Sequence, residues 1–302
     1  MFGTGEGFDY VKCVACGTLQ IKELPDLSRH YPEEYYSFSE VARPNGAGSL
    51  ARNLSPAFYG FTKWAKAVFP SAAARLGQLD LETQFLDKGL GLSAVLTARP
   101  PRGSRILDVG CGAGRLLRIL SELGYESLTG IDVFLNEDSG SVNGIRLFKK
   151  ELKEVEGEYD LIMFHHSFEH LAEPAESLWA AREKLADDGV CLVRIPVVNY
   201  AWEKYGVNWV GLDAPRHLHL FTEKGFCGLA ERAAFRVESI IYDSTSFQFI
   251  GSEQYKRNIP LSENVPASSL FARKQIREWK RKARLLNLEG RGDQAAFYLR
   301  PG

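Results

Sequence analysis

The segment RILDVGCGAGRLL, residues 105–117, constrains the fold more than any other part of the sequence. An apolar run containing Asp108 leads into a turn with glycine at positions 110, 112 and 114, and a helical pattern follows. Glycine adopts positive φ easily and lets the backbone approach a ligand closely, while the N–H groups of the following helix face that ligand. The segment therefore predicts a strand–turn–helix corner that binds a ligand.

Short β-rich runs alternate with helical runs between about residues 104 and 245. This alternation is typical of a parallel sheet covered by helices on both faces. Helices are expected after the first strand as far as Gly124, from Pro174 to Asp188 with Gly189 as terminator, and from a cap at Thr222. Strands are expected at Arg105–Val109, Ser127–Ile131, Ile145–Phe148, Asp160–Phe164, Val190–Ile195, Phe235–Tyr242 and, near the end of the chain, Ala295–Leu299.

Composition excludes several classes of protein. The 302 residues carry 37 Lys+Arg against 38 Asp+Glu, which argues against a surface built throughout to bind nucleic acid. No apolar run approaches the roughly 18 residues of a membrane span, and the start MFGTGEGFDY lacks the features of a secretory signal. Five cysteines are an odd number, so reduced thiols are expected rather than a disulfide framework. A cytoplasmic location follows as the expectation.

Changes in residue composition and in the spacing of apolar residues divide the chain into four parts. Residues 1–47 are aromatic and irregular and form an arm with a single CxxC. Residues 48–98 read as a helical preface, because apolar residues such as Phe58, Phe61 and Trp64 recur at spacings of three and four. Residues 99–245 form the catalytic core, and residues 246–302 contribute a helical insertion and the final core strand.

The spacing of the glycines separates two kinds of cofactor site. A dinucleotide fingerprint requires a glycine where this chain has Arg115, so the nicotinamide interpretation fails. The segment instead resembles motif I of the class I S-adenosylmethionine-dependent methyltransferases. That resemblance implies an α/β fold, with a seven-stranded doubly wound Rossmann-like sheet of order 3-2-1-4-5-7-6 whose last strand is antiparallel.

The same resemblance predicts a set of cofactor-binding residues. Asp132 ends the second strand, and an acidic residue there accepts hydrogen bonds from both ribose hydroxyls. Glu151 stands roughly where the family places an acidic residue near the adenine amino group, and its alternative is an exposed charge in KKELKE. The predicted cofactor-binding residues are Asp108, Gly110, Cys111, Gly112, Gly114, Asp132, Val133, Glu151, Leu152 and His165.

The segment HHSFEHLAEP after the fourth strand resembles that of the ubiquinone-biosynthesis type of methyltransferase, in which a Glu-His pair precedes a helix. Its histidines could be metal ligands, a general base or residues that shape the pocket. His166 and His170 have a spacing that could hold a metal on a helix, yet the sequence offers no third ligand. His170 is the first candidate base, followed by His166 and His217, because histidine titrates near neutral pH.

The chain beyond the fifth strand resembles a bacterial branch of this group that modifies sugars, lipids or the cell envelope. In PRHLHLFT, alternation places His217 and His219 on one face, and with Arg216 they could contact an anionic, ring-bearing substrate. The alternative is a packed strand with hydrogen-bonded histidines. The predicted substrate-binding residues are Tyr200, Trp209, Arg216 and His219, while Tyr35 and Tyr36 either fold over the cofactor or pack in the core.

Two further features stand outside this core. Cys13 and Cys16 resemble half of the zinc ribbon found in the same branch, but structural zinc requires four ligands and only one pair is present, so zinc is not expected. The segment ARKQIREWKRKAR, whose cations lie within residues 273–284, carries seven positive charges and one negative. Its basic face could steer phosphate-bearing substrates, touch anionic lipid or simply be solvated.

The sequence thus predicts an enzyme that transfers a methyl group from S-adenosylmethionine to a small-molecule or sugar- or lipid-linked acceptor, with S-adenosylhomocysteine as product. O-methylation by in-line displacement is the expected reaction. The alternatives are a protein or nucleic-acid methyltransferase and a non-catalytic S-adenosylmethionine-binding protein. No nucleic-acid partner and no transmembrane segment are expected, and the sequence predicts no oligomeric state.

Overall fold

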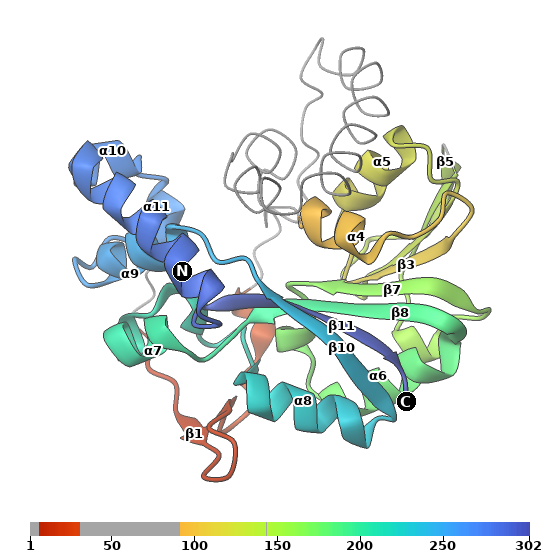
Figure 1. Cartoon of the computed structure of the whole chain (residues 1–302), viewed down its shortest axis with the longest axis horizontal. Coiled ribbons are helices and arrows are strands. Elements are labelled where there is room, and N and C mark those ends of the chain that lie inside the picture. Colours follow the sequence, from red (N-terminus) through yellow and green to blue (C-terminus); the bar gives the residue numbers. More distant parts are fainter. Residues whose placement is uncertain (1–5, 31–90, 143) are drawn as a thin grey trace, which may run out of the picture.

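The computed structural model describes residues 6–30, 91–142 and 144–302 of the chain (Figure 1). Its main sheet has eight strands, which run in the spatial order β10-β11-β8-β7-β3-β4-β6-β5. The strands of this sheet are β3 (Arg105–Val109), β4 (Ser127–Ile131), β5 (Ser139–Val142), β6 (Ile145–Phe148), β7 (Tyr159–His165), β8 (Leu185–Pro196), β10 (Phe235–Tyr242) and β11 (Gln294–Pro301).

Seven of these strands confirm the predicted topology. β6, β4, β3, β7 and β8 pair in parallel, and β11 enters antiparallel between β8 and β10. Taken in chain order, this is the arrangement 3-2-1-4-5-7-6 with an antiparallel last strand. The short β5, which the sequence analysis did not predict, adds an eighth strand antiparallel to β6 at the edge.

Helices cover both faces of the sheet, as expected for a doubly wound fold (Figure 1). On one face Leu92 of α4 (Leu92–Ala98) and Leu117 of α5 (Arg115–Glu122) share a buried cluster with Ile106 of β3. On the other face Leu178 of α6 (Pro174–Lys184) and Phe226 of α8 (Glu223–Arg232) join a second cluster. Buried apolar residues therefore alternate along the strands between two cores.

The helix predicted from Pro174 to Asp188 is shorter in the structure. It ends at Lys184, and β8 already begins at Leu185. Leu185 is buried and is the strand partner of Tyr159 in β7, so pairing with the sheet overrides the local helical pattern. The prediction was therefore wrong for residues 185–188.

A small second sheet ties the N-terminal residues to the core. β1 (Tyr10–Lys12) and β2 (Leu19–Ile21) form an antiparallel hairpin, and β2 pairs with β9 (His219–Leu220). The Tyr10 hydroxyl donates a hydrogen bond to the carbonyl oxygen of His217 at 2.8 Å. The hairpin therefore lies directly against the segment that carries the predicted histidines.

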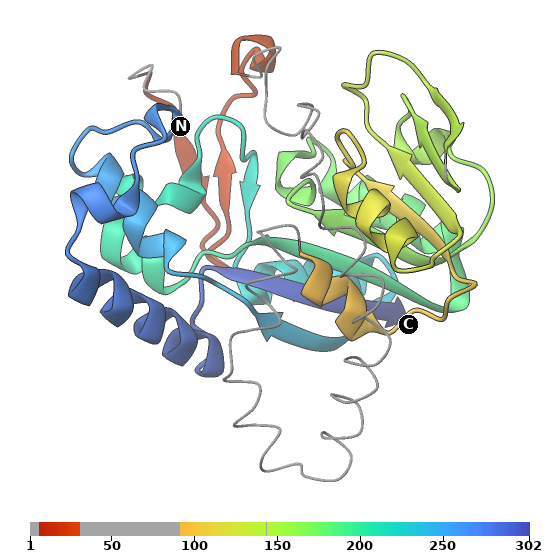
Figure 2. The same cartoon turned by 90° about the horizontal axis from the view of Figure 1, so that it is seen from above.

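A group of helices lies beyond the carboxyl ends of the parallel strands (Figures 1 and 2). It comprises α7 (Tyr200–Tyr205), which follows β8, and α9 (Phe247–Tyr255), α10 (Ala267–Leu270) and α11 (Arg273–Leu288) of the C-terminal insertion. Single 3₁₀ turns complete the described elements: η1 (Leu27–His30), η2 (Leu152–Glu154), η3 (Phe168–His170), η4 (Gly206–Asn208), η5 (Val210–Leu212) and η6 (Leu261–Glu263).

Some expectations concern residues outside the described ranges. They include the aromatic pair Tyr35 and Tyr36 and most of the predicted helical preface, of which only the C-terminal part appears, as α4. Within the described residues, no helix combines the length and apolar character that crossing a bilayer requires.

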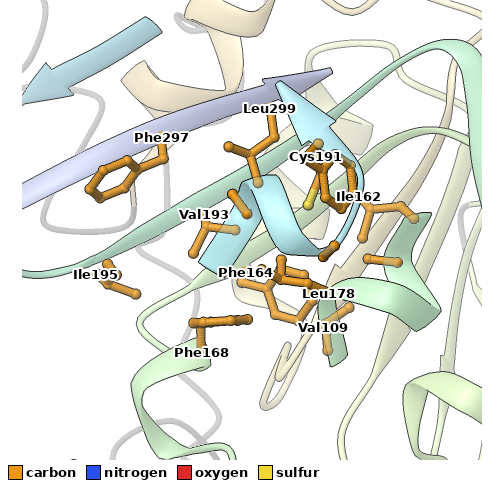
Figure 3. Packing of buried hydrophobic residues seen from close by; sticks show 14 of the residues in the cluster. Val109, Ile162, Phe164, Phe168, Leu178, Cys191, Val193, Ile195, Phe297 and Leu299 are labelled. Carbon is orange, nitrogen blue, oxygen red and sulfur yellow. The ribbon is translucent and has the colours of Figure 1, made fainter. Parts of the chain in front are cut away.

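β11 contributes buried side chains to the larger of the two core clusters of the main sheet. Figure 3 shows Phe297 and Leu299 of this strand beside Val193 and Cys191 of β8, and all four side chains are fully buried. The Phe297 ring lies 4.3 Å from the ring of Phe226 in α8, measured between centroids. β11 therefore joins β8, β10 and α8 into one packed unit.

This packing predicts a large loss of stability for Phe297→Ala. Removal of a fully buried aromatic side chain leaves a cavity and costs on the order of 3–5 kcal/mol. Phe247→Ala is the matched control, because this ring is 51% exposed, and its effect is expected to stay within about 0.5 kcal/mol. Urea unfolding of both variants measures the difference, and equal losses would contradict the packing described.

Candidate active site

The turn between β3 and α5, residues 110–114, forms a glycine-rich cradle. Gly110, Gly112 and Gly114 have φ values of 76°, 51° and 70°, which favour glycine. A Cβ at Gly110 would lie 2.4 Å from Cβ of Ser167, too close for any other residue. α5 begins at Arg115, directly after the turn, so its N-terminus faces the same space.

Two aspartates border the cradle. Asp132 follows β4, and its carboxylate oxygens accept hydrogen bonds from the Gly112 N–H at 3.0 Å and the Phe134 N–H at 2.9 Å. Asp108 is buried in β3, and desolvation together with the charge of Asp132 raises its pKa to about 7. Burial likewise raises the pKa of Asp132. The edge therefore concentrates negative charge beside the N-terminus of a helix.

Other predicted cofactor residues differ in their surroundings. Cys111 lies in the turn, and burial with the two neighbouring carboxylates raises the pKa of its thiol. Val133 is 46% exposed next to Asp132, where an apolar ligand surface could cover it. Glu151 caps η2 through a reciprocal hydrogen-bond pair with Glu154, and Leu152 packs in the core. The structure therefore gives Glu151 and Leu152 local structural roles.

His165 ends β7 on the other side of the cradle. Both of its ring nitrogens are buried, and neither has a hydrogen-bond partner among the described residues. Burial, followed by the charges of Arg194 and His166, lowers its pKa well below the ordinary value, so the ring is neutral near pH 7. Buried polar side-chain atoms are usually hydrogen-bonded, so a bound ligand could supply the hydrogen-bond partner of His165.

These observations fit S-adenosylmethionine. The positive-φ glycines let the turn pack closely against Ser167 and Leu147, Asp132 offers a carboxylate at the end of the second parallel strand, and His165 has unsatisfied ring nitrogens at the end of the fourth. Ligands of open α/β sheets bind at this edge, outside the carboxyl ends of the strands. The residues present could therefore hold the cofactor that the sequence predicts.

A buried carboxylate organises the histidines beside this cradle. Glu169 in η3 is fully buried, and its Oε1 lies 3.2 Å from Nδ1 of His166 and 3.8 Å from Nε2 of His217. Burial alone would raise the pKa of Glu169, but the hydrogen bond from His166 and the charges of His166, His170 and His217 lower it to about 2. Glu169 therefore stays ionised and holds the imidazoles around it.

His166 is held on both sides. Its Nδ1 faces Glu169, and its Nε2 lies 2.8 Å from a guanidinium nitrogen of Arg194, whose Nε donates to Asp243 at 2.6 Å. Its φ of 51° is unusual for a non-glycine residue. Arg194 and Asp243 were not among the residues predicted from the sequence. The available signal was a charged residue inside the apolar strand run VCLVRIP, because a buried arginine requires a partner.

His170 and His217 meet from opposite segments of the chain, with ring centroids 4.8 Å apart. Nδ1 of His170 donates to the carbonyl oxygen of Arg216 at 2.8 Å, since a carbonyl only accepts. Burial and the charge of His217 lower the pKa of His170 to about 4. His170 is therefore neutral, and a weak base, near pH 7.

His217 has a different environment. Its Nδ1 donates to the carbonyl oxygen of Gly211 at 2.8 Å, and its Nε2 lies 3.7 Å from Oδ2 of Asp213 as well as close to Glu169. Asp213 also pairs with the guanidinium of Arg216. Asp213 was not among the residues predicted from the sequence, because only the loop conformation brings this carboxylate to the histidine.

One cluster of described residues could hold a metal ion. Each of Glu169, His170 and His217 offers a ligand atom, and these atoms lie within 4.8 Å of one another. The sequence had paired His166 with His170 and offered no third ligand, whereas the fold adds His217 from a distant segment. Cys13 and Cys16 lie in the β1–β2 turn, and no such cluster of described residues includes them.

The predicted substrate-binding residues separate into two groups. Arg216 and His219 are buried near the histidine cluster, and Nδ1 of His219 donates to the carbonyl oxygen of Leu171 at 3.1 Å. Trp209 is fully buried, and its indole N–H bonds to Asp293. Tyr200 lines a separate cavity of about 420 Å³ against α11 and contacts Lys282. The structure therefore does not bring Trp209 and Tyr200 to the histidines.

The raised pKa of Asp108 predicts a pH-dependent effect of Asp108→Asn. Between about pH 4 and pH 7, Asp108 is protonated in the folded protein but ionised in the unfolded chain, where its pKa is near 4. The free energy of unfolding therefore falls as the pH rises through this range. Above pH 7 the variant should be more stable than the natural protein by on the order of 1–3 kcal/mol. Thermal unfolding across this pH range measures the difference.

The exposed Asp187 provides the control for that measurement. Asp187→Asn is expected to change stability by less than about 0.5 kcal/mol. A difference between Asp108→Asn and the natural protein that stays constant across the pH range would contradict the proposed charge burial.

Comparisons with known proteins identify the family to which the chain belongs. Residues 83–240, just over half of the chain, match a family model described as a methyltransferase domain. A ubiquinone biosynthesis O-methyltransferase of Cereibacter sphaeroides is 32% identical over 133 residues, covering 40% of this chain and 53% of that protein. A second, from Azorhizobium caulinodans, is 27% identical over 134 residues with the same coverage. The chain spans about half the length of the curated relatives it matches.

Solved structures are similar at lower identity. An S-adenosylmethionine dependent methyltransferase from Mesorhizobium loti matches with a TM-score of 0.44 and 16% identity, over 70% of this chain and 98% of that chain. A 1,6-didemethyltoxoflavin-N1-methyltransferase from Burkholderia thailandensis, with S-adenosylhomocysteine bound, matches with a TM-score of 0.39 and 18% identity, over 67% and 84%. The family match and the confirmed strand order together show that the chain belongs to the methyltransferase-domain family of the class I type.

Proposed function

We propose that this chain binds S-adenosylmethionine and transfers its methyl group to the oxygen of a small-molecule or lipid- or sugar-linked acceptor. The observation that supports this most directly is the cradle of Gly110, Gly112 and Gly114, in which the Gly112 N–H donates to the carboxylate of Asp132. The curated relatives are O-methyltransferases, which favours oxygen as the acceptor atom.

Within this proposal the sulfonium cofactor supplies an electrophilic methyl group. Asp132 orients the nucleoside through its carboxylate, and the acidic edge of Asp108 and Asp132 favours a positively charged ligand. Holding two reactants in line can contribute about 7–11 kcal/mol, whereas a general base contributes about 10²–10⁴-fold in rate. Positioning by the chain is therefore the larger expected contribution.

His217 is the best placed of the three candidate bases. Both ring nitrogens of His166 are engaged, with Glu169 and Arg194, and the low pKa of His170 makes it a poor proton acceptor. Nδ1 of His217 donates to the carbonyl oxygen of Gly211, which leaves the lone pair on Nε2, and the carboxylates of Glu169 and Asp213 lie within 3.8 Å of that nitrogen. In the proposed step the acceptor oxygen bonds to the methyl carbon, its proton moves to Nε2 of His217, and the electrons of the broken carbon–sulfur bond remain on sulfur.

Calorimetry with S-adenosylmethionine and S-adenosylhomocysteine tests the cofactor assignment. The natural protein should bind both ligands. Gly110→Ala should lose measurable binding, because a Cβ there meets Ser167 and the backbone needs positive φ. Gly103→Ala serves as control, since nothing lies within 4 Å of a Cβ at this position. Absence of binding to either ligand by the folded natural protein would refute the proposal.

Turnover with labelled S-adenosylmethionine and a panel of hydroxylated acceptors tests the base. His217→Gln should lower kcat by about 10²–10⁴-fold with cofactor affinity retained. His30→Gln is the matched control, because His30 is equally buried but belongs to the N-terminal residues and pairs with Glu6. Unchanged turnover of His217→Gln would show that this residue does not accept the proton. Turnover only on a peptide or an oligonucleotide would show that the acceptor is a macromolecule and not a small molecule.

A further inference from the structure

Helix α11 carries an exposed face that the proposed reaction does not use. Its buried stripe consists of Trp279, Ala283 and Leu286, with Ile276 partly buried beside them. These residues recur at spacings of three and four and pack against the cluster that contains Phe249 of α9. The packing fixes the rotation of the helix, and the opposite face points into solvent.

That outward face is mainly cationic, with Glu278 as an acidic residue among its exposed positions. Positions 273, 277, 281, 284 and 288 also recur at spacings of three and four, so they form one row along the helix. The first four are arginines, Lys274 lies beside them, and all of these side chains are exposed. Among the described residues, no carboxylate lies within ion-pair distance of Arg273, Lys274, Arg277 or Arg281. The charge of these four residues is therefore not neutralised by a carboxylate of the described part of the fold.

The C-terminal end of the same face is apolar. Leu285 is 46% exposed and Leu288 is 79% exposed. Leu288 continues the arginine row, and Leu285 adjoins it one turn earlier along the helix. Exposure of large aliphatic side chains beside a row of cations is the pattern by which proteins attach to the surface of an anionic bilayer.

The position of α11 leaves this face accessible to a flat partner. Figure 2 shows the helix along the outer edge of the C-terminal insertion, with α7 and α9 on its inner side. The helix is 16 residues long, and its row of arginines spans most of that length. A planar anionic surface can therefore contact the whole row at once.

We infer that α11 is a docking surface for a membrane rich in anionic lipid, with the arginine row at the headgroups and Leu285 and Leu288 at their boundary with the acyl chains. A lipid surface is favoured over a nucleic acid because the exposed apolar residues of the face are aliphatic, whereas single-stranded nucleic acids stack on aromatic rings. This inference does not depend on the methyl-transfer proposal, because it uses none of the residues of the glycine cradle or the histidine cluster.

Co-sedimentation with vesicles tests the docking surface. The natural protein should bind vesicles of phosphatidylcholine mixed with phosphatidylglycerol and should not bind vesicles of phosphatidylcholine alone. Binding should weaken as salt is added, because exposed charges are screened. The triple variant R273Q/R277Q/R281Q should lower the partition coefficient about tenfold or more.

Two further variants separate charge from insertion. K22Q/R232Q/R236Q removes the same number of exposed cations elsewhere on the surface and should bind as the natural protein does. L285S/L288S should weaken binding by at least several-fold and leave the salt dependence in place. These solvent-exposed changes are expected to leave the thermal midpoint and cofactor binding unchanged, which distinguishes lost docking from misfolding.

Two results would contradict the proposed docking surface. Equal binding of the two triple variants would show that only net charge matters and would overturn the surface. Binding to a single-stranded oligonucleotide that exceeds binding to anionic vesicles at the same ionic strength would replace the lipid with a nucleic acid.

Discussion

The parallel pairing of β3 with β4 on one side and β7 on the other is the constraint on which the rest of the structure depends. Because the three strands run in one direction, the glycine turn, Asp132 and His165 emerge at a single edge. Each of them alone is an ordinary loop feature. At this edge the Gly112 N–H is bonded to the carboxylate of Asp132, and the buried imidazole of His165 lies at the end of the neighbouring strand.

Glu169 plays the corresponding role on the acceptor side. A fully buried carboxylate is costly unless it is paired, and here the pairing comes from imidazoles of two distant segments. The network continues through His166 and Arg194 to Asp243 on the far side of β8. Because each group is held by its neighbour, the fold fixes the orientations of the rings.

In the C-terminal insertion, the role of a residue depends on whether it lies on the buried or the exposed side of its helix. The apolar stripe of α11 packs against α9, which leaves the arginines no freedom to turn inward. The basic run identified in the sequence is therefore a coherent row instead of charge spread around a helix. Tyr200 and Trp209 were predicted to bind substrate, but Tyr200 lies at the interface with α11 and Trp209 lies in a buried cluster.

The sequence by itself determined the strand order, the glycine cradle and the position of Asp132, because these depend on local spacing and on pairing rules that hold throughout a family. The tertiary structure alone decided which histidine has two carboxylates within reach, that Arg194 and Asp243 belong to the site, and that residues 185–188 are strand. These outcomes rest on contacts between segments far apart in the chain, and burial sets their energies. A local pattern can show that a residue such as Arg194 requires a partner, but it does not show which residue the fold supplies.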